Sequence, residues 1–365
     1  MKFLHIMRND KFINPFITFI NKNFSNDNNK FIVIDGSTEI ELVDYKNTER
    51  YISIGKNNSK NVKIILMILQ LPFLFIKLFI NYVKADKIYF HGLFEPRHIL
   101  FLYIFRFFLK KSSWIMWGGD LYYYYFKKDT RLTLKKKIYF YFDKKVKGSF
   151  NSYITFMKGD YRIMQEYCSG KGKLELSFTY PSNFYKEINL KKQKKEEIWI
   201  QLGNSEDPDN NHFEILEKIK KFKDLKIKCF CILSYVDELT EYKKNVIKKG
   251  REYFKENFVP VTSFMPYDEY LEFLGNIDIA IFAHNRAQAF GNTTSLLSME
   301  KTIYLKKETS TYETLTDMGI KVKTFDELNT LEMFDEETLK NNKKIMKEKF
   351  SEKELIKQWE RIFNS

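Results

Sequence analysis

Short apolar runs alternate with longer amphipathic stretches along the first half of the chain. Apolar runs between polar turns are typical of buried strands, and the stretches between them have helical spacing. Strands are predicted at 2–7, 31–35, 87–90, 113–117 and 151–156. Strands that alternate with helices favour a parallel sheet covered on both faces. The first half therefore predicts a Rossmann-like α/β domain.

The same alternation returns after a polar run at 185–197, which is the best candidate for a linker. Strands are then predicted at 198–202, 225–233, 258–264, 277–283, 302–305 and 321–325, and helices at 212–222, 238–257, 267–276 and 293–300. The predicted domains are 1–184 and 198–345, with an amphipathic helix within 346–365 that packs back on the first domain. We expect two parallel sheets that face each other across an interdomain cleft, the default place for a site.

Charge and composition narrow the class of protein. The 365 residues are 44% hydrophobic and 30% charged, which is typical of a globular chain of two domains. Lys and Arg outnumber Asp and Glu by 61 to 47, a net charge of +14, which favours an anionic partner. A nucleic-acid-binding protein is a remote alternative, because no helix-turn-helix, RNA-recognition or zinc pattern is present. The three cysteines form no disulfide framework and indicate reduced core residues of a cytoplasmic protein.

Three successive stretches of the first half, 64–83, 97–111 and 127–147, combine aliphatic and aromatic residues with basic edges. The first approaches the length of a membrane span, yet its longest uncharged part has only 13 residues, 64–76. Such helices suit the surface of an anionic leaflet, although core helices with one solvated face have the same pattern. We expect a cytoplasmic protein that associates peripherally with the cytoplasmic face of the membrane.

Two loops of the first half, 91–96 and 117–122, follow buried strands and carry the strongest candidate chemistry. Ligands of open α/β sheets bind at this edge, and the aromatic residues of both loops suit sugar faces. Asp120 is the first candidate for a general base, and Glu95 and His91 are the next. The alternative is that Asp120 caps the next helix and that His91 is satisfied at the rim of the core.

Two segments of the second half are candidate phosphate sites. The first is Gly203, Asn204 and Ser205, at a strand-to-helix turn where backbone N–H groups can face an anion. The second opens a predicted helix at Thr293 and comprises Gly291, Asn292, Thr293, Thr294 and Ser295. Hydroxyls and free N–H groups at a positive helix end suit a diphosphate, although an ordinary N-cap has the same composition.

Charged residues follow both candidate strand ends of the second half. Arg286 is expected to neutralise a departing diphosphate. Asp207 and Asp209 have the spacing of an acid-x-acid metal site, but Pro208 between them favours a simple turn. We therefore expect no metal and no cofactor, with the nucleotide sugar as a substrate.

With these segments located, the chain resembles a known enzyme family. The resemblance rests on segments 89–96, 114–122, 202–205, 267–271 and 282–283, together with His212 and Asp278. In order and spacing they are similar to the bacterial lipid-linked 4-acetamido-4,6-dideoxygalactosyl (N-acetylfucosaminyl) transferases of glycosyltransferase family 56. The resemblance implies a GT-B fold, a donor sugar on a nucleoside diphosphate, dTDP above all, and a polyprenyl-diphosphate-linked saccharide acceptor in cell-surface polysaccharide synthesis.

The resulting hypothesis divides the work between the domains. The donor diphosphate lies on the helix at Thr293 and on the 203–205 turn, where helix N-termini and Arg286 meet the charge of the leaving group. The acceptor hydroxyl comes from the first domain. Alternatives are a GT-B transferase that acts on a soluble or glycan acceptor and a nucleotide-sugar epimerase. The donor sugar, the linkage, inversion or retention, the identity of the base and the oligomeric state are left open.

Overall fold

The computed structural model describes residues 2–34, 41–51, 60–126, 131, 133–188, 195–234 and 240–365. Four predicted segments fall partly outside these residues: the end of strand 31–35, the starts of helices 127–147 and 238–257, and positions 189–194 of the linker. The chain divides into two compact units, Met1–Ser182 with Leu355–Ser365 (unit 1) and Asn183–Glu354 (unit 2).

Unit 1 is built on a seven-stranded parallel sheet with the order β3-β2-β1-β4-β5-β6-β7. The strands are β1 (Phe3–Arg8), β2 (Asn29–Ile34), β3 (Thr48–Tyr51), β4 (Lys87–His91), β5 (Ser112–Ile115), β6 (Ser152–Thr155) and β7 (Lys173–Leu176). The five predicted strands are present. The sequence pattern missed β3 and β7, because these short edge strands are half exposed and carry charged residues.

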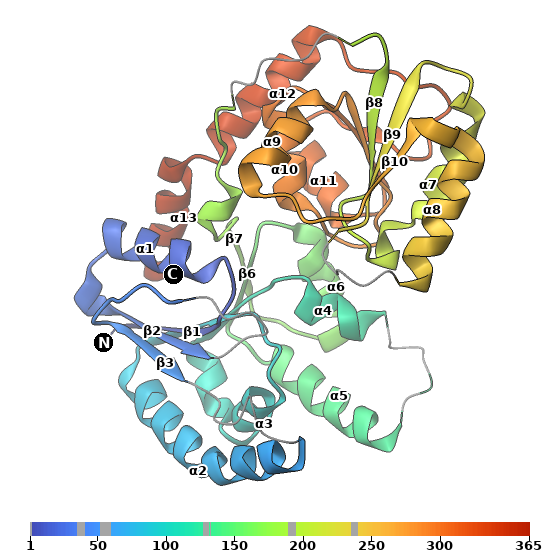
Figure 1. The fold of residues 1–365 in the computed structure, drawn as a ribbon. Helices are drawn as coiled ribbons and strands as arrows, with labels where there is room; N and C mark the ends of the chain where they lie inside the picture. The colour runs from blue at the N-terminus through green and yellow to red at the C-terminus, as the bar shows by residue number, and fades with distance from the viewer. Residues whose placement is uncertain are drawn as a thin grey trace. The chain divides into compact units, whose positions relative to one another are not determined.

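Helices cover both faces of this sheet (Figure 1). They are α1 (Ile13–Asn23), α2 (Lys60–Lys84), α3 (Pro96–Ile104), α4 (Gly119–Tyr125), α5 (Leu134–Lys147), α6 (Lys158–Cys168) and α13 (Glu352–Asn364), with 3-10 turns η1 (Asn26–Asn28), η2 (Arg106–Lys111) and η3 (Pro181–Asn183). Leu4 and Ile6 of β1 face the core that α2, α3, α5 and α6 cover. Alternation turns His5 to the opposite face, where it meets Phe16 of α1 and Trp359 of α13.

The terminal helix α13 is firmly integrated into unit 1. Leu355, Trp359 and Ile362 are buried, and the Phe363 ring stacks on Phe3 with 4.2 Å between centroids. The indole Nε1 of Trp359 also donates a 3.2 Å hydrogen bond to the Thr179 carbonyl. This helix therefore closes the hydrophobic core on the face that carries His5.

Unit 2 contains a six-stranded parallel sheet with the order β10-β9-β8-β11-β12-β13. Its strands are β8 (Ile198–Leu202), β9 (Ile227–Ile232), β10 (Phe258–Val261), β11 (Ile279–Phe282), β12 (Thr302–Leu305) and β13 (Lys323–Thr324). All six were predicted. The two parallel sheets confirm the predicted α/β class with two Rossmann-like halves.

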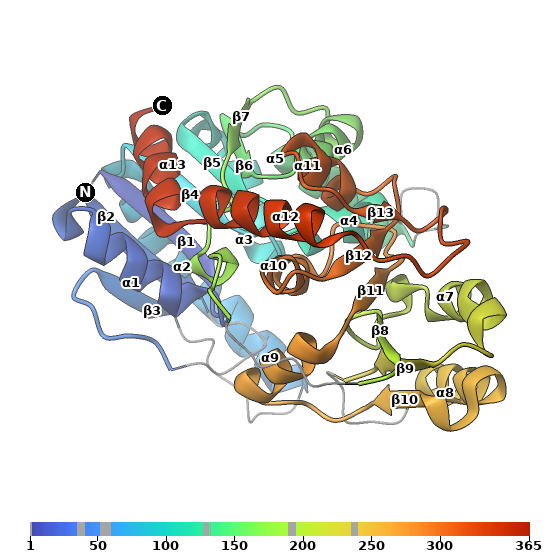
Figure 2. The ribbon, with the colours of Figure 1, turned by 90° about the horizontal axis from the view of Figure 1, so that it is seen from above.

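Two layers of helices enclose this second sheet, with α7 and α8 on one face and α9, α10 and α12 on the other (Figures 1 and 2). The helices are α7 (His212–Ile219), α8 (Glu241–Phe254), α9 (Tyr267–Asn276), α10 (Phe290–Ser298), α11 (Ser310–Asp317) and α12 (Glu336–Lys349), with 3-10 turns η4 (Pro208–Asn210), η5 (Lys220–Phe222) and η6 (Lys255–Asn257). The order of the sheet places the ends of β8 and β11 side by side.

The apolar stretch 64–83 forms a single helix, α2, which continues through Pro72. Within the described part of the chain, no helix combines the length and the apolarity that crossing a membrane requires.

Candidate functional site

Asp120 ties together the two loops at the carboxyl edge of the unit 1 sheet. Its Oδ2 accepts hydrogen bonds from the Leu93 backbone N–H at 2.9 Å and the Trp114 indole at 2.7 Å. Its Oδ1 accepts a third from the Trp117 backbone N–H at 3.1 Å. The side chain is only 1% exposed. Asp120 thus clamps the β4 and β5 loops, and both of its buried oxygens accept hydrogen bonds from N–H donors. Its role as the base stays a prediction.

A buried lysine supports this clamp from below. Lys147 donates to the Asp120 carbonyl at 2.7 Å and to the Asp143 carboxylate at 2.9 Å, and its ammonium lies 5.3 Å from the centre of the Trp114 ring. Burial raises the pKa of Asp120, while the Lys147 charge and the N–H donors oppose the rise. These groups form a satisfied polar network inside the core, which rigidifies the loops above it.

His91 lies in a second buried network, on the other face of the sheet. The Asn29 amide donates to a main-chain carbonyl, so its Oδ1 accepts the proton on His5 Nε2 at 3.3 Å. His5 Nδ1 then accepts from His91 Nε2 at 3.1 Å, and His91 Nδ1 accepts from the Tyr180 hydroxyl at 2.8 Å. That hydroxyl accepts from the Trp117 indole at 2.7 Å. Every N–H and O–H in this chain of bonds therefore points the same way.

This arrangement leaves His91 without a free nitrogen. Burial lowers the pKa of His91 well below its ordinary value, and the neighbouring His5 adds to the shift. His91 is thus a buried, neutral histidine that orients Tyr180.

Aromatic rings form a shelf above these networks. Phe12, Phe94 and Trp117 are neighbours, since the Trp117 ring lies 5.8 Å from each of the two phenylalanine rings. The Arg8 guanidinium lies 5.4 Å from the centre of the Phe94 ring. Gly92 has a φ of +76°, and a Cβ there would come within 2.6 Å of Phe94, so glycine is needed for this packing. We call Phe12, Phe94 and Trp117 the aromatic shelf.

Glu95 differs from the other two candidates because it is partly accessible. Its side chain is 26% exposed and pairs with Arg97 at 3.2 Å. It precedes Pro96 at the start of α3 but makes no capping hydrogen bond. An Arg partner this close competes with any hydroxyl for the Glu95 carboxylate.

At the carboxyl edge of unit 2, the turn after β8 is held by a buried asparagine. Asn210 is fully buried, and its Oδ1 accepts from the Asn204 backbone N–H at 2.8 Å. Its Nδ2 donates to Ser205 Oγ at 3.1 Å. Gly203 has a φ of +65°, and a Cβ there would come within 2.6 Å of His212 Nε2. The 203–205 turn is therefore a fixed scaffold.

Two buried histidines pack around this turn. His284 Nε2 lies 2.9 Å from Asn210 Oδ1, which acts as acceptor, so that nitrogen carries the proton. His212 Nδ1 lies 3.0 Å from the Tyr242 hydroxyl. Burial lowers the pKa of His284 to about 3 and that of His212 to about 4, so both are neutral.

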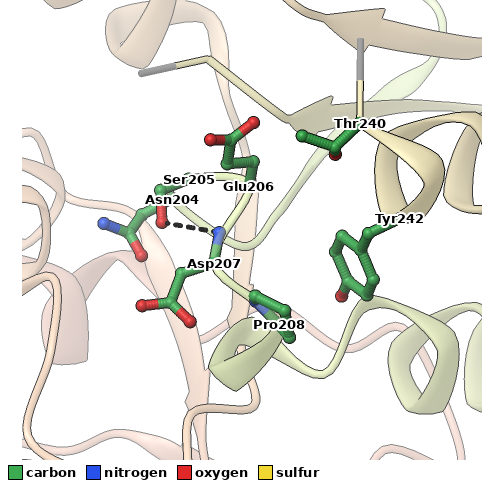
Figure 3. A pocket seen from close by; sticks show the side chains of 7 residues that line it. All are labelled: Asn204, Ser205, Glu206, Asp207, Pro208, Thr240 and Tyr242. Carbon is green, nitrogen blue, oxygen red and sulfur yellow. Dashed lines mark hydrogen bonds between the residues drawn. The ribbon is translucent and has the colours of Figure 1, made fainter. Parts of the chain in front are cut away.

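A pocket of about 600 Å³ opens beside the turn (Figure 3). It is lined by Asn204, Ser205, Glu206, Asp207, Pro208, Thr240 and Tyr242. At its wall Glu206 forms a 2.7 Å ion pair with Lys243, which is only 2% exposed. The volume lies in the range that suits a small-molecule ligand.

Arg286 lies on the loop after β11 and pairs with two carboxylates. Its Nε donates to Asp209 at 2.9 Å and its Nη2 to Asp207 at 3.1 Å. Asp207 also accepts from the Asp209 backbone N–H, as expected of a turn. No group of three or more His, Cys, Asp or Glu among the described residues could hold a metal ion.

The second predicted phosphate segment needs a correction. Helix α10 begins at Phe290, three residues before the predicted start at Thr293. The Thr293 hydroxyl donates to the Ala289 carbonyl, and those of Thr294 and Ser295 donate to the Gly291 carbonyl. These hydroxyls are therefore bound inside the helix. The N–H groups of the first turn, from Phe290 to Asn292, are the ones without an intrahelical acceptor.

The start of α10 has two further marks of a ligand site. Ala289, its N-cap, has a φ of +58°, a left-handed conformation that costs alanine about 1 kcal/mol. Gly291 is exposed, and a Cβ there would meet no described atom within 4 Å. Neither protein packing nor a positive φ requires a glycine at this position.

Comparison with known proteins settles the family. A family model described as 4-alpha-L-fucosyltransferase, glycosyl transferase group 56, matches residues 76–365. The chain belongs to glycosyltransferase family 56. The sequence resemblance is thereby confirmed, and the protein is a glycosyltransferase.

Solved structures show the same fold at low identity. Sucrose-phosphate synthase from Thermosynechococcus elongatus matches with a TM-score of 0.66 and 8% identity, covering 100% of this chain and 98% of that one. Anabaena HepE in complex with UDP gives 0.64 and 10%, with 100% of both chains covered. WaaG, a glycosyltransferase involved in lipopolysaccharide biosynthesis, gives 0.61 and 10%, covering 100% and 99%. The predicted GT-B fold is confirmed.

Several residues of this family 56 glycosyltransferase were missed from the sequence. Asn210 had no signal beyond its place in a polar turn, and Thr240 and Tyr242 come from a different strand-to-helix connection. Tyr180 lies beyond β7, a strand that the pattern did not predict. Tyr180 and Tyr242 contact His91 and His212, which lie 89 and 30 residues away in sequence, and no local motif reports such contacts.

Proposed function

We propose that this glycosyltransferase moves a deoxyamino sugar from a dTDP-linked donor to a polyprenyl-diphosphate-linked saccharide in cell-surface polysaccharide synthesis. The main support for a donor site is a pocket beside the 203–205 turn. The strained start of α10 at Ala289 and the side chain of Arg286 lie at the same edge of the unit 2 sheet. Sheet edges of this kind bind ligands in open α/β folds.

The donor diphosphate would lie at the N-terminus of α10. There the backbone N–H groups of residues 290–292 and the helix dipole favour an anion, and Gly291 leaves room for it. Arg286 would exchange its aspartate partners for the phosphates, and Asn204 would contribute from the neighbouring turn. The nucleoside would occupy the pocket that Tyr242 and Thr240 line. In this mechanism the leaving diphosphate is stabilised by fixed donors and by Arg286.

A nucleotide screen tests the donor assignment. We expect dTDP to raise the melting temperature of the protein more than UDP or GDP, and dTDP-linked deoxyamino sugars to support transfer. Arg286→Gln should weaken dTDP binding about 10-fold or more, because it removes a charge-assisted contact to phosphate. Lys218→Gln, which alters a partly exposed lysine paired with Asp326, is a matched control that should bind normally. Equal shifts with all three nucleotides would remove the dTDP assignment, and no shift with any would remove the donor site.

The acceptor saccharide would lie on the aromatic shelf of unit 1. Aromatic rings bind the apolar faces of pyranoses, and Arg8 beside Phe94 could meet an acceptor phosphate. Asp120 and His91 are committed to internal hydrogen bonds, so neither is proposed to accept the proton of the acceptor hydroxyl.

The lipid-linked nature of the acceptor is supported by the outward side of α2, α3, η2 and α5. Large apolar residues with 41–75% exposure lie on these elements: Phe73, Ile76, Ile80, Val83, Leu100, Ile104, Phe107, Leu134, Ile138 and Tyr141. We call these ten residues the outer apolar face. Exposed basic residues accompany them: Lys84, Arg106, Lys110, Lys135, Lys136, Lys137, Lys144 and Lys145. Exposed apolar residues together with cations suit the cytoplasmic surface of an anionic bilayer.

Vesicle binding tests this surface. We expect the protein to bind vesicles of anionic phospholipid and to be released partly as salt rises. The double variant Ile76→Ser/Ile80→Ser should lose most of this binding. Leu225→Ser, which changes a 52% exposed leucine of unit 2, should bind as the parent does. If the parent protein ignores anionic vesicles at low and moderate salt, the peripheral-membrane part of the proposal is wrong.

A further inference from the structure

A third carboxylate, not suggested by the sequence pattern, lies at the carboxyl edge of unit 1. Asp10 follows β1, which ends at Arg8, and leads into α1. The backbone around it is fixed, since the Asn9 N–H donates to the Ile34 carbonyl at 2.7 Å and the Ile13 N–H donates to the Asp10 carbonyl at 3.0 Å. Because β1 lies beside β4 in a parallel sheet, Asp10 and the His91–Glu95 loop share one edge.

The Asp10 carboxylate is uncommitted. The residue is half-buried, its Oδ1 is buried, and no described residue donates a hydrogen bond or an ion pair to that oxygen. By contrast, Asp120 accepts three N–H donors and Glu95 pairs with an arginine. A buried oxygen without a donor costs about 1–3 kcal/mol, so a ligand that donates a hydrogen bond to Asp10 would recover this cost.

The surroundings of Asp10 point to a sugar hydroxyl as its partner. Asp10 lies two residues before Phe12, whose ring is 5.8 Å from the Trp117 ring. The Asp10 charge also adds to burial and Asp120 in raising the pKa of Tyr180. The Tyr180 ring lies 5.9 Å from both Phe12 and Trp117 of the aromatic shelf. Asp10 therefore adjoins a surface suited to a pyranose ring.

We propose that Asp10 is the general base of the transfer reaction, an inference that rests on the proposed glycosyl transfer. The acceptor hydroxyl gives its proton to the Asp10 carboxylate while its oxygen forms a bond to the anomeric carbon of the donor. The bond from that carbon to the diphosphate oxygen breaks, and its electron pair leaves with the nucleoside diphosphate. The proton then passes from Asp10 to solvent. Trp117, fixed by Tyr180, orients the acceptor ring for this step.

The test compares three purified variants with the parent protein. Asp10→Asn should lower kcat about 100-fold or more, the usual contribution of a general base, while dTDP binding and the unfolding free energy stay at the parent values or rise. Asp10→Glu should keep measurable turnover, because it retains a carboxylate. Asp86→Asn is the matched control, since Asp86 is exposed at the opposite edge of the same sheet, before β4, and its loss should leave turnover unchanged.

The outcomes separate this inference from the proposed function. If the parent protein transfers sugar and Asp10→Asn does so within about threefold of it, Asp10 is not the base. A large loss in Glu95→Gln with none in Asp10→Asn would move the role to Glu95. If the parent protein transfers no nucleotide-linked sugar at all, the proposed function fails first.

Discussion

The carboxyl edges of the two sheets are built on opposite plans. At the unit 1 edge, Asp120 accepts hydrogen bonds from both sheet-edge loops, and His91 is bonded to His5 and Tyr180. The aromatic shelf lies at the same edge. At the unit 2 edge, the fixed groups are a buried asparagine and two neutral histidines, whereas Arg286, Asn204 and the start of α10 remain at the surface.

This difference matches the two substrates of a glycosyltransferase. A saccharide is recognised through ring faces and hydroxyls, for which rigid aromatic rings and one uncommitted carboxylate are suited. A nucleoside diphosphate is recognised by N–H groups and cations that can exchange partners. Under the proposed function, Asp120 and His91 belong to the scaffold of the first edge, and Arg286 and the start of α10 are the groups of the second edge that meet the donor.

Acid should weaken both scaffolds, and this is the largest effect we expect. All five histidines of the chain are buried with lowered pKa: His5, His91, His98, His212 and His284. Because the folded pKa lies below the unfolded value of about 6.5, the stabilisation is complete above that pH. Each histidine loses this contribution to the free energy of unfolding as the pH falls from 6.5 towards 4. Between pH 6.5 and 5 the loss is up to about 2 kcal/mol for each histidine.

Urea unfolding at pH 7.5 and 5.0 measures this loss. The raised pKa values of Asp120 and Asp143 oppose it in unit 1, since these groups bind protons more readily when folded. His98→Gln should lower the number of protons taken up on unfolding by up to about one, so that the free energy of unfolding depends less steeply on pH. Equal stability at both pH values would contradict neutral buried histidines.

Asp120→Asn distinguishes a scaffold from a catalyst. The carboxylate of Asp120 accepts from N–H donors on both of its oxygens, whereas an asparagine would turn an NH₂ group towards some of these donors. We therefore expect the free energy of unfolding to fall by about 3–4 kcal/mol. Chemical denaturation followed by tryptophan fluorescence measures it. A variant as stable as the parent but without turnover would return Asp120 to the role of base.

A pair of glycine substitutions sharpens the contrast within unit 2. Gly203→Ala should destabilise the protein by about 2 kcal/mol, because the φ of +65° is strained for alanine and the new Cβ would clash with His212. Gly291→Ala should stabilise it by about 0.5–1 kcal/mol, since alanine favours a helix and meets open space. The same alanine should weaken dTDP binding if the diphosphate lies there. Unchanged dTDP affinity in Gly291→Ala would move the diphosphate elsewhere.

Tyr180→Phe tests the hydrogen-bonded support of Trp117 at the unit 1 edge. It removes the hydroxyl that accepts from Trp117 and leaves His91 Nδ1 without its donor, at a cost of about 1–2 kcal/mol. The looser Trp117 should raise the KM for the acceptor severalfold and leave the KM for the donor unchanged. A rise in the donor KM instead would break the division between the two edges.

The sequence predicted the strands well wherever both faces are buried. It failed at β3 and β7, where an edge strand needs apolar residues on only part of its surface. The helix start at Phe290 was missed because its N-cap, Ala289, has no side chain that signals a cap.

For the candidate site, the motifs located loops at the carboxyl edges of both sheets but not the hydrogen-bond partners of their residues. Asp120 and His91 are at the predicted edge, yet their hydrogen-bond partners come from Leu93, Tyr180 and His5, far away in sequence. Asp10 had no motif, because its distinguishing property is the lack of any described partner for its buried oxygen. Whether a carboxylate already accepts hydrogen bonds depends on the tertiary structure and cannot be predicted from a local sequence motif.

Hydrogen exchange with and without dTDP is the most direct test of the central claim, that the nucleotide binds at the unit 2 edge. We expect slower amide exchange in segments 203–210, 240–242 and 284–292, and no change in 8–12, 91–96 or 117–122. Protection of the latter segments, with none in the former, would contradict the account.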